Sequence, residues 1–78
     1  MSYTIRQAVY DTLADKPIGT EFACIDFFDE CRERMAMNGN YRRPFDGTLQ
    51  RELRRNRALF KIVCVDNKKS IYKIEERY

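Results

Sequence analysis

The chain of 78 residues contains no histidine. A catalytic base would therefore have to be a carboxylate or a thiol. The three cysteines, Cys24, Cys31 and Cys64, are odd in number and form no CxxC pair, so neither a disulfide framework nor a zinc site is predicted. We expect all three thiols to be reduced, small and partly buried.

Glycine is scarce, and its three copies stand alone at positions 19, 39 and 47. No glycine-rich loop is available to hold a phosphate group. Asp26, Asp29 and Glu30 are most simply explained as charges near the start of a helix, where carboxylates favour the helix dipole. We expect no enzymatic activity, no metal and no cofactor.

Long apolar runs are also missing, since no segment approaches the ~20 residues that cross a bilayer. The N-terminus lacks the pattern of a signal peptide. We therefore expect a soluble, cytoplasmic protein without a membrane partner. The length allows one domain, residues 1–78, and the apolar share of 44% with five Phe and five Tyr suffices for a thin core.

Charge is unevenly distributed along the chain. Residues 1–31 hold two bases against six acids, a net charge of −4, whereas residues 32–78 hold thirteen bases against six acids, a net charge of +7. The densest segment, RRPFDGTLQRELRRNR over residues 42–57, contains six arginines and two acids. This uneven charge indicates that one face of the protein binds a polyanion. The alternative is that the basic residues only keep the surface soluble.

Hydrophobic periodicity predicts two helices in the first half of the chain. The first spans about residues 4–15, with Thr4 and Gln7 forming a capping box. GTEF, residues 19–22, is expected to be a short strand. The second helix runs to about Met37 and ends near Gly39, where glycine can adopt a left-handed conformation. Its predicted inward stripe comprises Ile25, Phe28, Cys31 and Met35, with Cys24 and Phe27 beside it.

A third helix is predicted from about Pro44 to Arg57, because proline suits the first helical position. Its helical wheel places Phe45, Leu49 and Leu53 on the inward face. A β-hairpin is predicted to follow, with strands in Phe60–Val65 and SIYKI and a polar turn DNKK between them.

This order is that of an α+β winged helix-turn-helix domain, with three helices, a C-terminal β-hairpin wing and a short strand after helix 1. The run TLQRELRRNR, residues 48–57, resembles the recognition helix of winged-helix proteins, and SIYKI resembles the strand that closes the wing. The connector over residues 37–44 is longer than the tight turn of a minimal helix-turn-helix. The resemblance implies a DNA-binding domain of the kind found in small bacterial and phage proteins.

Two groups of residues are predicted to contact DNA. On the outward face of helix 3, Gln50, Arg51 and Arg54 can reach base edges, since Arg pairs with guanine and Gln with adenine. Phosphate contacts are predicted for the surrounding cations: Arg42, Arg43 and Arg55 beside the helix, and Lys68 and Lys69 at the wing tip. The alternative for the helix is a solvated face, helped by pairs such as Glu52 with Arg55 or Asn56. The tip lysines could instead blunt edge pairing and aid solubility.

The leading hypothesis is sequence-specific binding of double-stranded DNA, as a small transcriptional regulator or a phage-like accessory factor. A homodimer through helix 1 or the acidic half is compatible with this role. The alternative is a winged-helix module that docks its basic helix on an acidic protein partner. Single-stranded binding by stacking of nucleobases is less supported, because aromatic residues other than Tyr41 are sparse among the basic residues predicted to be exposed.

Overall fold

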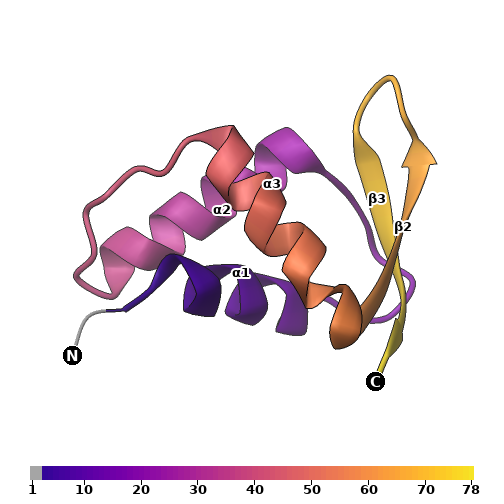
Figure 1. Cartoon of the computed structure of the whole chain (residues 1–78), viewed down its shortest axis with the longest axis horizontal. Coiled ribbons are helices and arrows are strands. Elements are labelled where there is room, and N and C mark those ends of the chain that lie inside the picture. The colour runs from indigo at the N-terminus through magenta and orange to yellow at the C-terminus, as the bar shows by residue number, and fades with distance from the viewer. Residues whose placement is uncertain (1–2) are drawn as a thin grey trace.

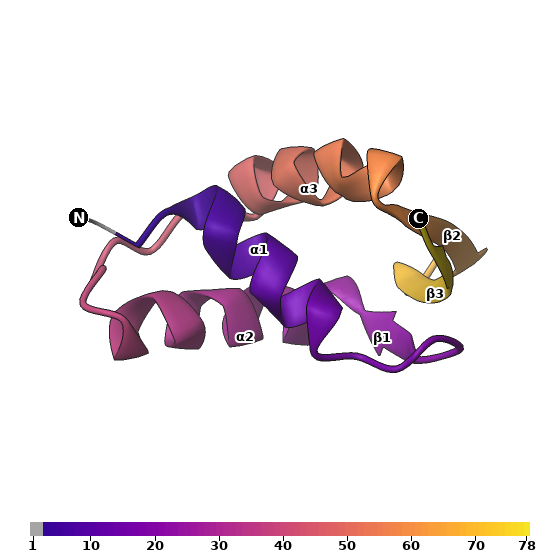
Figure 2. The ribbon, with the colours of Figure 1, turned by 90° about the horizontal axis from the view of Figure 1, so that it is seen from below.

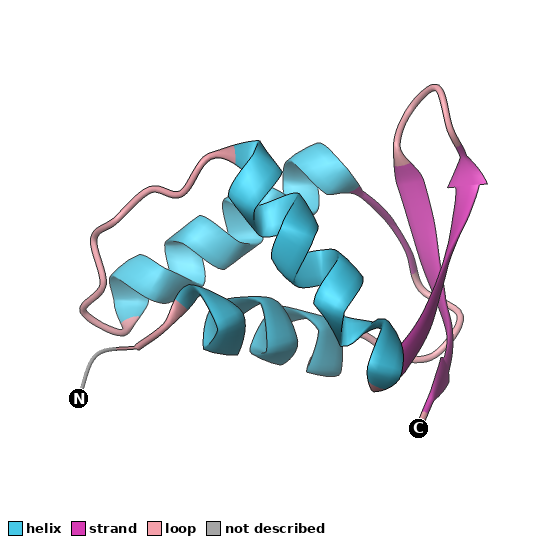
Figure 3. Ribbon diagram, in the orientation of Figure 1, coloured by secondary structure: helices cyan, strands magenta, loops and turns pink. Residues whose placement is uncertain are grey.

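The computed structural model describes residues 3–78 and has an α+β architecture with three α-helices and one antiparallel sheet (Figure 1). The elements in chain order are α1 (Ile5–Ala14), β1 (Glu21–Ala23), α2 (Cys24–Met37), α3 (Asp46–Arg55), a short 3-10 turn (Asn56–Ala58), β2 (Phe60–Asp66) and β3 (Ile71–Arg77). Figure 3 shows that a long loop joins α2 to α3, as the sequence predicts.

The sheet has the order β1-β3-β2, with β3 in the centre. Antiparallel pairing places Phe22 opposite Tyr72 on one side of β3 and Ile62 opposite Ile74 on the other. The predicted hairpin and the predicted short strand are therefore confirmed, and the short strand pairs with the hairpin. Because β1 directly precedes α2, its pairing with β3 joins the helical half of the domain to the hairpin.

The helices enclose the core, with α2 and α3 on opposite sides and α1 across them (Figure 2). Each helix and each strand contributes apolar side chains to one cluster, which includes Val9, Leu13, Phe22, Phe27, Cys31, Leu49, Leu53, Phe60 and Ile74. Burial of this cluster is the main force that holds the three helices against the sheet.

Helix α1 begins at the predicted position. The backbone N–H of Gln7 donates to Oγ1 of Thr4 at 3.0 Å, which satisfies one of the free amides of the first turn. The Gln7 side chain donates instead to Asp11 at 2.7 Å. The capping box is therefore half formed, because Asp11 one turn further along is a charged acceptor for the amide.

Helix α2 buries the predicted stripe except at its first turn. Phe28, Cys31 and Met35 are buried as predicted, as are Cys24 and Phe27, whereas Ile25 is 69% exposed and the prediction for it is wrong. The backbone N–H of Cys24 donates to the carbonyl oxygen of Ser70 at 2.9 Å, so the first turn of α2 is attached to the hairpin. This attachment turns Ile25 toward solvent. At the other end of the helix, Gly39 has the predicted left-handed conformation, with φ of 84°.

The prediction for the start of α3 is wrong by two residues. The helix begins at Asp46, and Phe45 precedes it with extended backbone angles, φ −69° and ψ 156°. Phe45 therefore lies off the helical wheel, and its side chain is 84% exposed rather than buried. The cause lies in α2, where Arg32 donates from Nε to the Pro44 carbonyl at 3.0 Å and also pairs with Asp46.

The cysteines divide into two classes. Cys24 and Cys31 are buried, as predicted, whereas Cys64 is exposed. Cys64 lies on β2 close to the turn, where the hairpin extends past the helices that would cover it. Within residues 3–78, no helix is long and apolar enough to cross a membrane.

Candidate nucleic-acid interface

Helix α3 separates apolar and cationic side chains cleanly. Leu49 and Leu53 are buried in the core, whereas Arg51 and Arg54 are exposed. Residues three apart lie on the same face of a helix, so these two guanidinium groups share one outward surface. The predicted orientation of the helix is thus confirmed for both leucines and both arginines.

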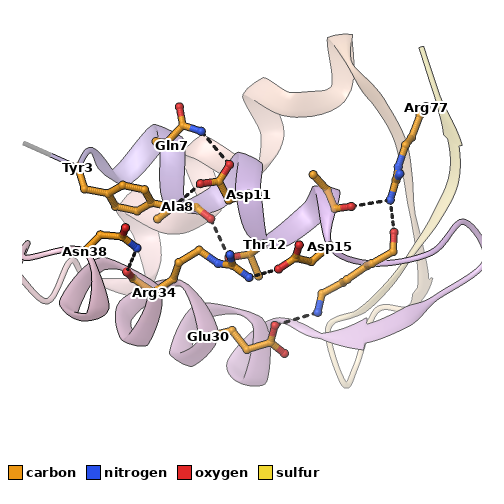
Figure 4. A network of polar contacts seen from close by, with 12 residues as sticks. Tyr3, Gln7, Ala8, Asp11, Thr12, Asp15, Glu30, Arg34, Asn38 and Arg77 are labelled. Carbon is orange, nitrogen blue, oxygen red and sulfur yellow. Dashed lines mark hydrogen bonds and ion pairs between the residues drawn. The ribbon is translucent and has the colours of Figure 1, made fainter.

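Several cations in the described chain are held by carboxylates or by backbone carbonyl oxygens. Arg34 on α2 pairs with Asp15 after α1, and Lys16 pairs with Glu30 at 2.9 Å (Figure 4). Arg77 donates to the carbonyl oxygen of Ala14 at 2.9 Å. These contacts join α1 to α2 and to the end of β3, so they serve the fold.

A second set of cations has, among residues 3–78, neither a carboxylate within 4.0 Å nor a carbonyl oxygen bound to the side chain. It comprises Arg42, Arg43, Arg51, Arg54, Arg57, Lys68, Lys69 and Lys73. Six of these eight are predicted site residues. The unpaired positive charge is concentrated in the connector, along α3 and the turn that follows it, and in the hairpin.

Arg55 differs from its neighbour Arg54. Its Nη1 lies 3.7 Å from Oε1 of Glu52, and the other oxygen of Glu52 lies 3.6 Å from Nε of Arg6 on α1. Glu52 is 15% exposed, so the pair is partly shielded from water. Arg55 is therefore less free than Arg54 to bind an anion, in agreement with the alternative that the sequence left open.

Gln50 is half buried at the side of α3. Its Oε1 accepts a weak hydrogen bond from the Cys24 thiol, with a sulfur–oxygen distance of 3.8 Å. Burial raises the pKa of the Cys24 thiol, so the thiol stays protonated and can donate. This contact orients the amide, and the Nε2 group of Gln50 can still donate a hydrogen bond to a ligand.

Arg42 and Arg43 project from the connector into solvent. Asn40 holds the first part of this connector. Its Nδ2 donates to the Tyr3 carbonyl at 2.6 Å, and its Oδ1 accepts from the Arg42 backbone N–H at 3.1 Å. The two arginines are therefore presented from a fixed backbone.

Lys68 and Lys69 occupy the turn of the hairpin, which projects beyond the helices (Figure 1). Both of their backbone N–H groups donate to Oδ1 of Asp66 at 3.1 Å. A single carboxylate thus orders the turn while both lysine side chains remain exposed. The tip is a cationic point separate from the surface of α3.

Arg57 and Lys73 are unpaired cations that the sequence analysis did not select. Arg57 lies in the 3-10 turn directly after α3, and Lys73 lies on β3. Arg57 belongs to the arginine-rich segment and could have been chosen on that ground. Lys73 could not have been chosen, because the residues beside it on the neighbouring strands depend on the strand register, which the sequence does not show.

Two hollows adjoin α1. The larger, of about 1100 Å³, lies between the start of α1 and the loop over residues 38–42. The smaller, of about 480 Å³, lies between α1 and the end of α3. Both have Arg6 and Glu52 in their walls, so the ion pair between these residues stands where the hollows meet. Among the described residues, no group of His, Cys, Asp and Glu is arranged to hold a metal ion.

Comparisons with known proteins found no relative, since no family model, curated protein or solved structure matches this chain. The function is therefore argued from the placement of charge and of exposed side chains.

Proposed function

We propose that the chain is a winged-helix domain that binds double-stranded DNA with sequence preference. The order of elements and the central position of β3 support this architecture. In it, α3 is the recognition helix and the β2–β3 hairpin is the wing. A role as a small transcriptional regulator or phage-like accessory factor would follow.

The observation that carries the proposal is the sorting of cations into paired and unpaired sets. Bases that join α1, α2 and β3 are neutralised by carboxylates or bound to carbonyl oxygens, as Arg34 and Arg77 are. Arg51, Arg54 and the two lysines of the hairpin turn, Lys68 and Lys69, have no carboxylate partner within the described chain. A surface of unpaired guanidinium groups on a helix anchored by leucines suits a polyanion.

In the proposed complex α3 enters the major groove. Arg51 and Arg54 donate to base edges, for which guanine O6 and N7 are the favoured acceptors. Arg42 and Arg43 bind phosphates beside the start of the helix, and the lysines of the hairpin tip bind phosphates at a second point. Two separate phosphate contacts would fix the direction of α3 on the duplex.

Gel retardation over a series of salt concentrations tests the proposal. If about five phosphates are contacted, log K should fall against log[salt] with a slope of about −4.5. Selection from random duplexes, repeated with Arg51→Ala and Arg54→Ala, should show that each variant loses preference at defined base positions. Lys61→Ala is the control, because Lys61 pairs with Glu75 at 3.8 Å on the sheet. Absence of retardation of any duplex at low salt would refute the proposal.

The second candidate is a winged-helix module that docks on an acidic protein. The same unpaired arginines favour it, because interface cores are enriched in arginine. Retention of an acidic protein without any duplex binding would establish this alternative. Its salt dependence would not follow the release of counterions from DNA.

A further inference from the structure

The segment Tyr41–Arg42–Arg43–Pro44–Phe45 carries two large exposed rings. The Tyr41 side chain is 80% exposed and that of Phe45 is 84% exposed. The segment lies outside helix and strand, directly before α3. Aromatic side chains bury roughly 150–250 Å² each when they are covered, so two uncovered rings leave a large apolar surface in water. Both rings are therefore free to contact a ligand.

The backbone of this segment is held at both ends. Before it, Asn40 is bonded to the Tyr3 carbonyl and to the Arg42 backbone N–H. After it, Arg32 holds the Pro44 carbonyl and the Asp46 carboxylate. Pro44 restricts its own backbone and that of the residue before it. The rings are therefore presented by an ordered support, which lowers the entropy lost when a ligand binds.

The charge between the rings identifies the class of ligand. Arg42 and Arg43 are exposed and have no carboxylate partner among the described residues, and the nearest acid in sequence, Asp46, is already paired with Arg32. Alternation of aromatic and basic side chains is the arrangement that binds nucleic acids, because the rings stack on bases while the cations bind phosphates. An apolar membrane or protein surface would not require both arginines.

We propose that Tyr41 and Phe45 stack on unpaired or unstacked bases next to the duplex that α3 holds. The inference rests on the proposed function and specifies its substrate as a duplex with a distorted or unpaired step. Phe45 directly precedes the first residue of α3. Its ring would therefore contact the bases next to the point where the helix enters the groove. Stacking of an aromatic ring on an exposed base stabilises the base outside its normal stack.

Binding to two probes at one salt concentration tests the inference. One probe is a short fully paired duplex, and the other is the same duplex with a two-nucleotide bulge. The natural protein should bind the bulged probe more tightly. Phe45→Ala and Tyr41→Ala should each weaken binding to the bulged probe about 5- to 150-fold, the range given by stacking of one base. Both variants should bind the paired probe within about twofold of the natural protein, since each arginine remains.

Tyr78→Ala is the matched control, because Tyr78 is also an exposed aromatic residue but follows β3. It should leave binding to both probes unchanged. Equal affinity of the natural protein for the two probes would overturn the inference and leave the proposed function standing. Unchanged binding of the bulged probe by both aromatic variants would also overturn it and would assign the rings to a protein partner. Failure to bind either probe would remove both proposals.

Discussion

Nε of Arg32 donates to the carbonyl oxygen of Pro44 at 3.0 Å, directly ahead of α3. The same guanidinium group pairs with Asp29 on its own helix and with Asp46 at the start of α3. Its side chain is 14% exposed, so these contacts are partly shielded from water. One residue of α2 thus decides where α3 begins and how Phe45 is presented.

Arg32→Ala should lower the free energy of unfolding by about 1–2 kcal/mol, because charged hydrogen bonds to three acceptors are lost while the two carboxylates stay solvated. Urea denaturation followed by circular dichroism measures the change. Arg57→Ala is the control and should stay within about 0.5 kcal/mol, since Arg57 is exposed and unpaired in the described chain. Equal urea midpoints for Arg32→Ala and the natural protein would contradict this account.

Leu49 and Phe45 form a second matched pair. Leu49 is fully buried, so Leu49→Ala should cost about 2–5 kcal/mol of unfolding free energy. Phe45→Ala should cost less than about 0.5 kcal/mol, because its ring is already in water. Thermal or urea unfolding of both variants measures the difference. A large loss of stability in Phe45→Ala would show that the ring is covered in solution.

The helices, the hairpin and the cationic face of α3 could be predicted from the sequence because each depends on local rules. Thr4 caps α1, Gly39 closes α2, and the spacing of Leu49 and Leu53 sets the buried face of α3. The same rules failed for Phe45, since a helical wheel describes a residue only after the helix has begun. The position of that start depends on Arg32, which is far away in sequence.

The candidate site could be predicted by type of residue, and its ion pairs only in part. The spacing of three residues on the helix already favours pairing of Glu52 with Arg55 rather than with Arg54. The sequence could not show that α1 also brings Nε of Arg6 to 3.6 Å from Glu52. Likewise, the contact between Gln50 and Cys24 requires the packing of α3 against the start of α2.

Arg54→Ala and Arg55→Ala should therefore differ in their effect on the proposed DNA binding. Because Arg54 is proposed to contact a base edge, Arg54→Ala should weaken binding to the selected duplex by about 1–3 kcal/mol. Arg55→Ala should weaken it less, because Glu52 already neutralises part of its charge. Fluorescence anisotropy with the selected duplex at one salt concentration measures both affinities. A larger effect of Arg55→Ala would contradict the proposed division of roles.

Tyr3 should make stability depend on alkaline pH. Burial and the hydrogen bond from its hydroxyl to Asp11, at 2.5 Å, raise the pKa of Tyr3 from 10.0 to about 12. The folded state therefore holds the phenolic proton more tightly than the unfolded state does. The resulting stabilisation is complete below pH 10 and is lost as the pH rises toward 12.

Tyr3→Phe isolates this contribution, because phenylalanine has no proton to lose. The difference in unfolding free energy between Tyr3→Phe and the natural protein should be constant below pH 10. Between pH 10 and 12 the natural protein should lose stability relative to Tyr3→Phe. Urea denaturation at each pH measures it. A difference that does not change with pH would show that Asp11 does not hold the phenol.

The three thiols should react in a defined order. Cys64 is exposed and should be labelled at once by a thiol reagent near neutral pH, whereas the buried Cys24 and Cys31 should be labelled slowly. Burial also raises the pKa of the Cys31 thiol to about 11, which lowers its reactive thiolate fraction. Mass spectrometry of native and urea-unfolded samples counts the labels, and Cys64→Ala should remove the fast one. Rapid labelling of Cys31 in the native protein would contradict its position in the core.

The central strand of the sheet is also the last of the three to be synthesised. Neither β1 nor β2 has a strand partner until residues 71–77 have left the ribosome. The sheet cannot assemble stepwise during translation, and β1 must wait for a partner about fifty residues away. Formation of the hairpin is then the event that closes the domain, so substitutions in β3 should slow folding more than equally destabilising substitutions in α1.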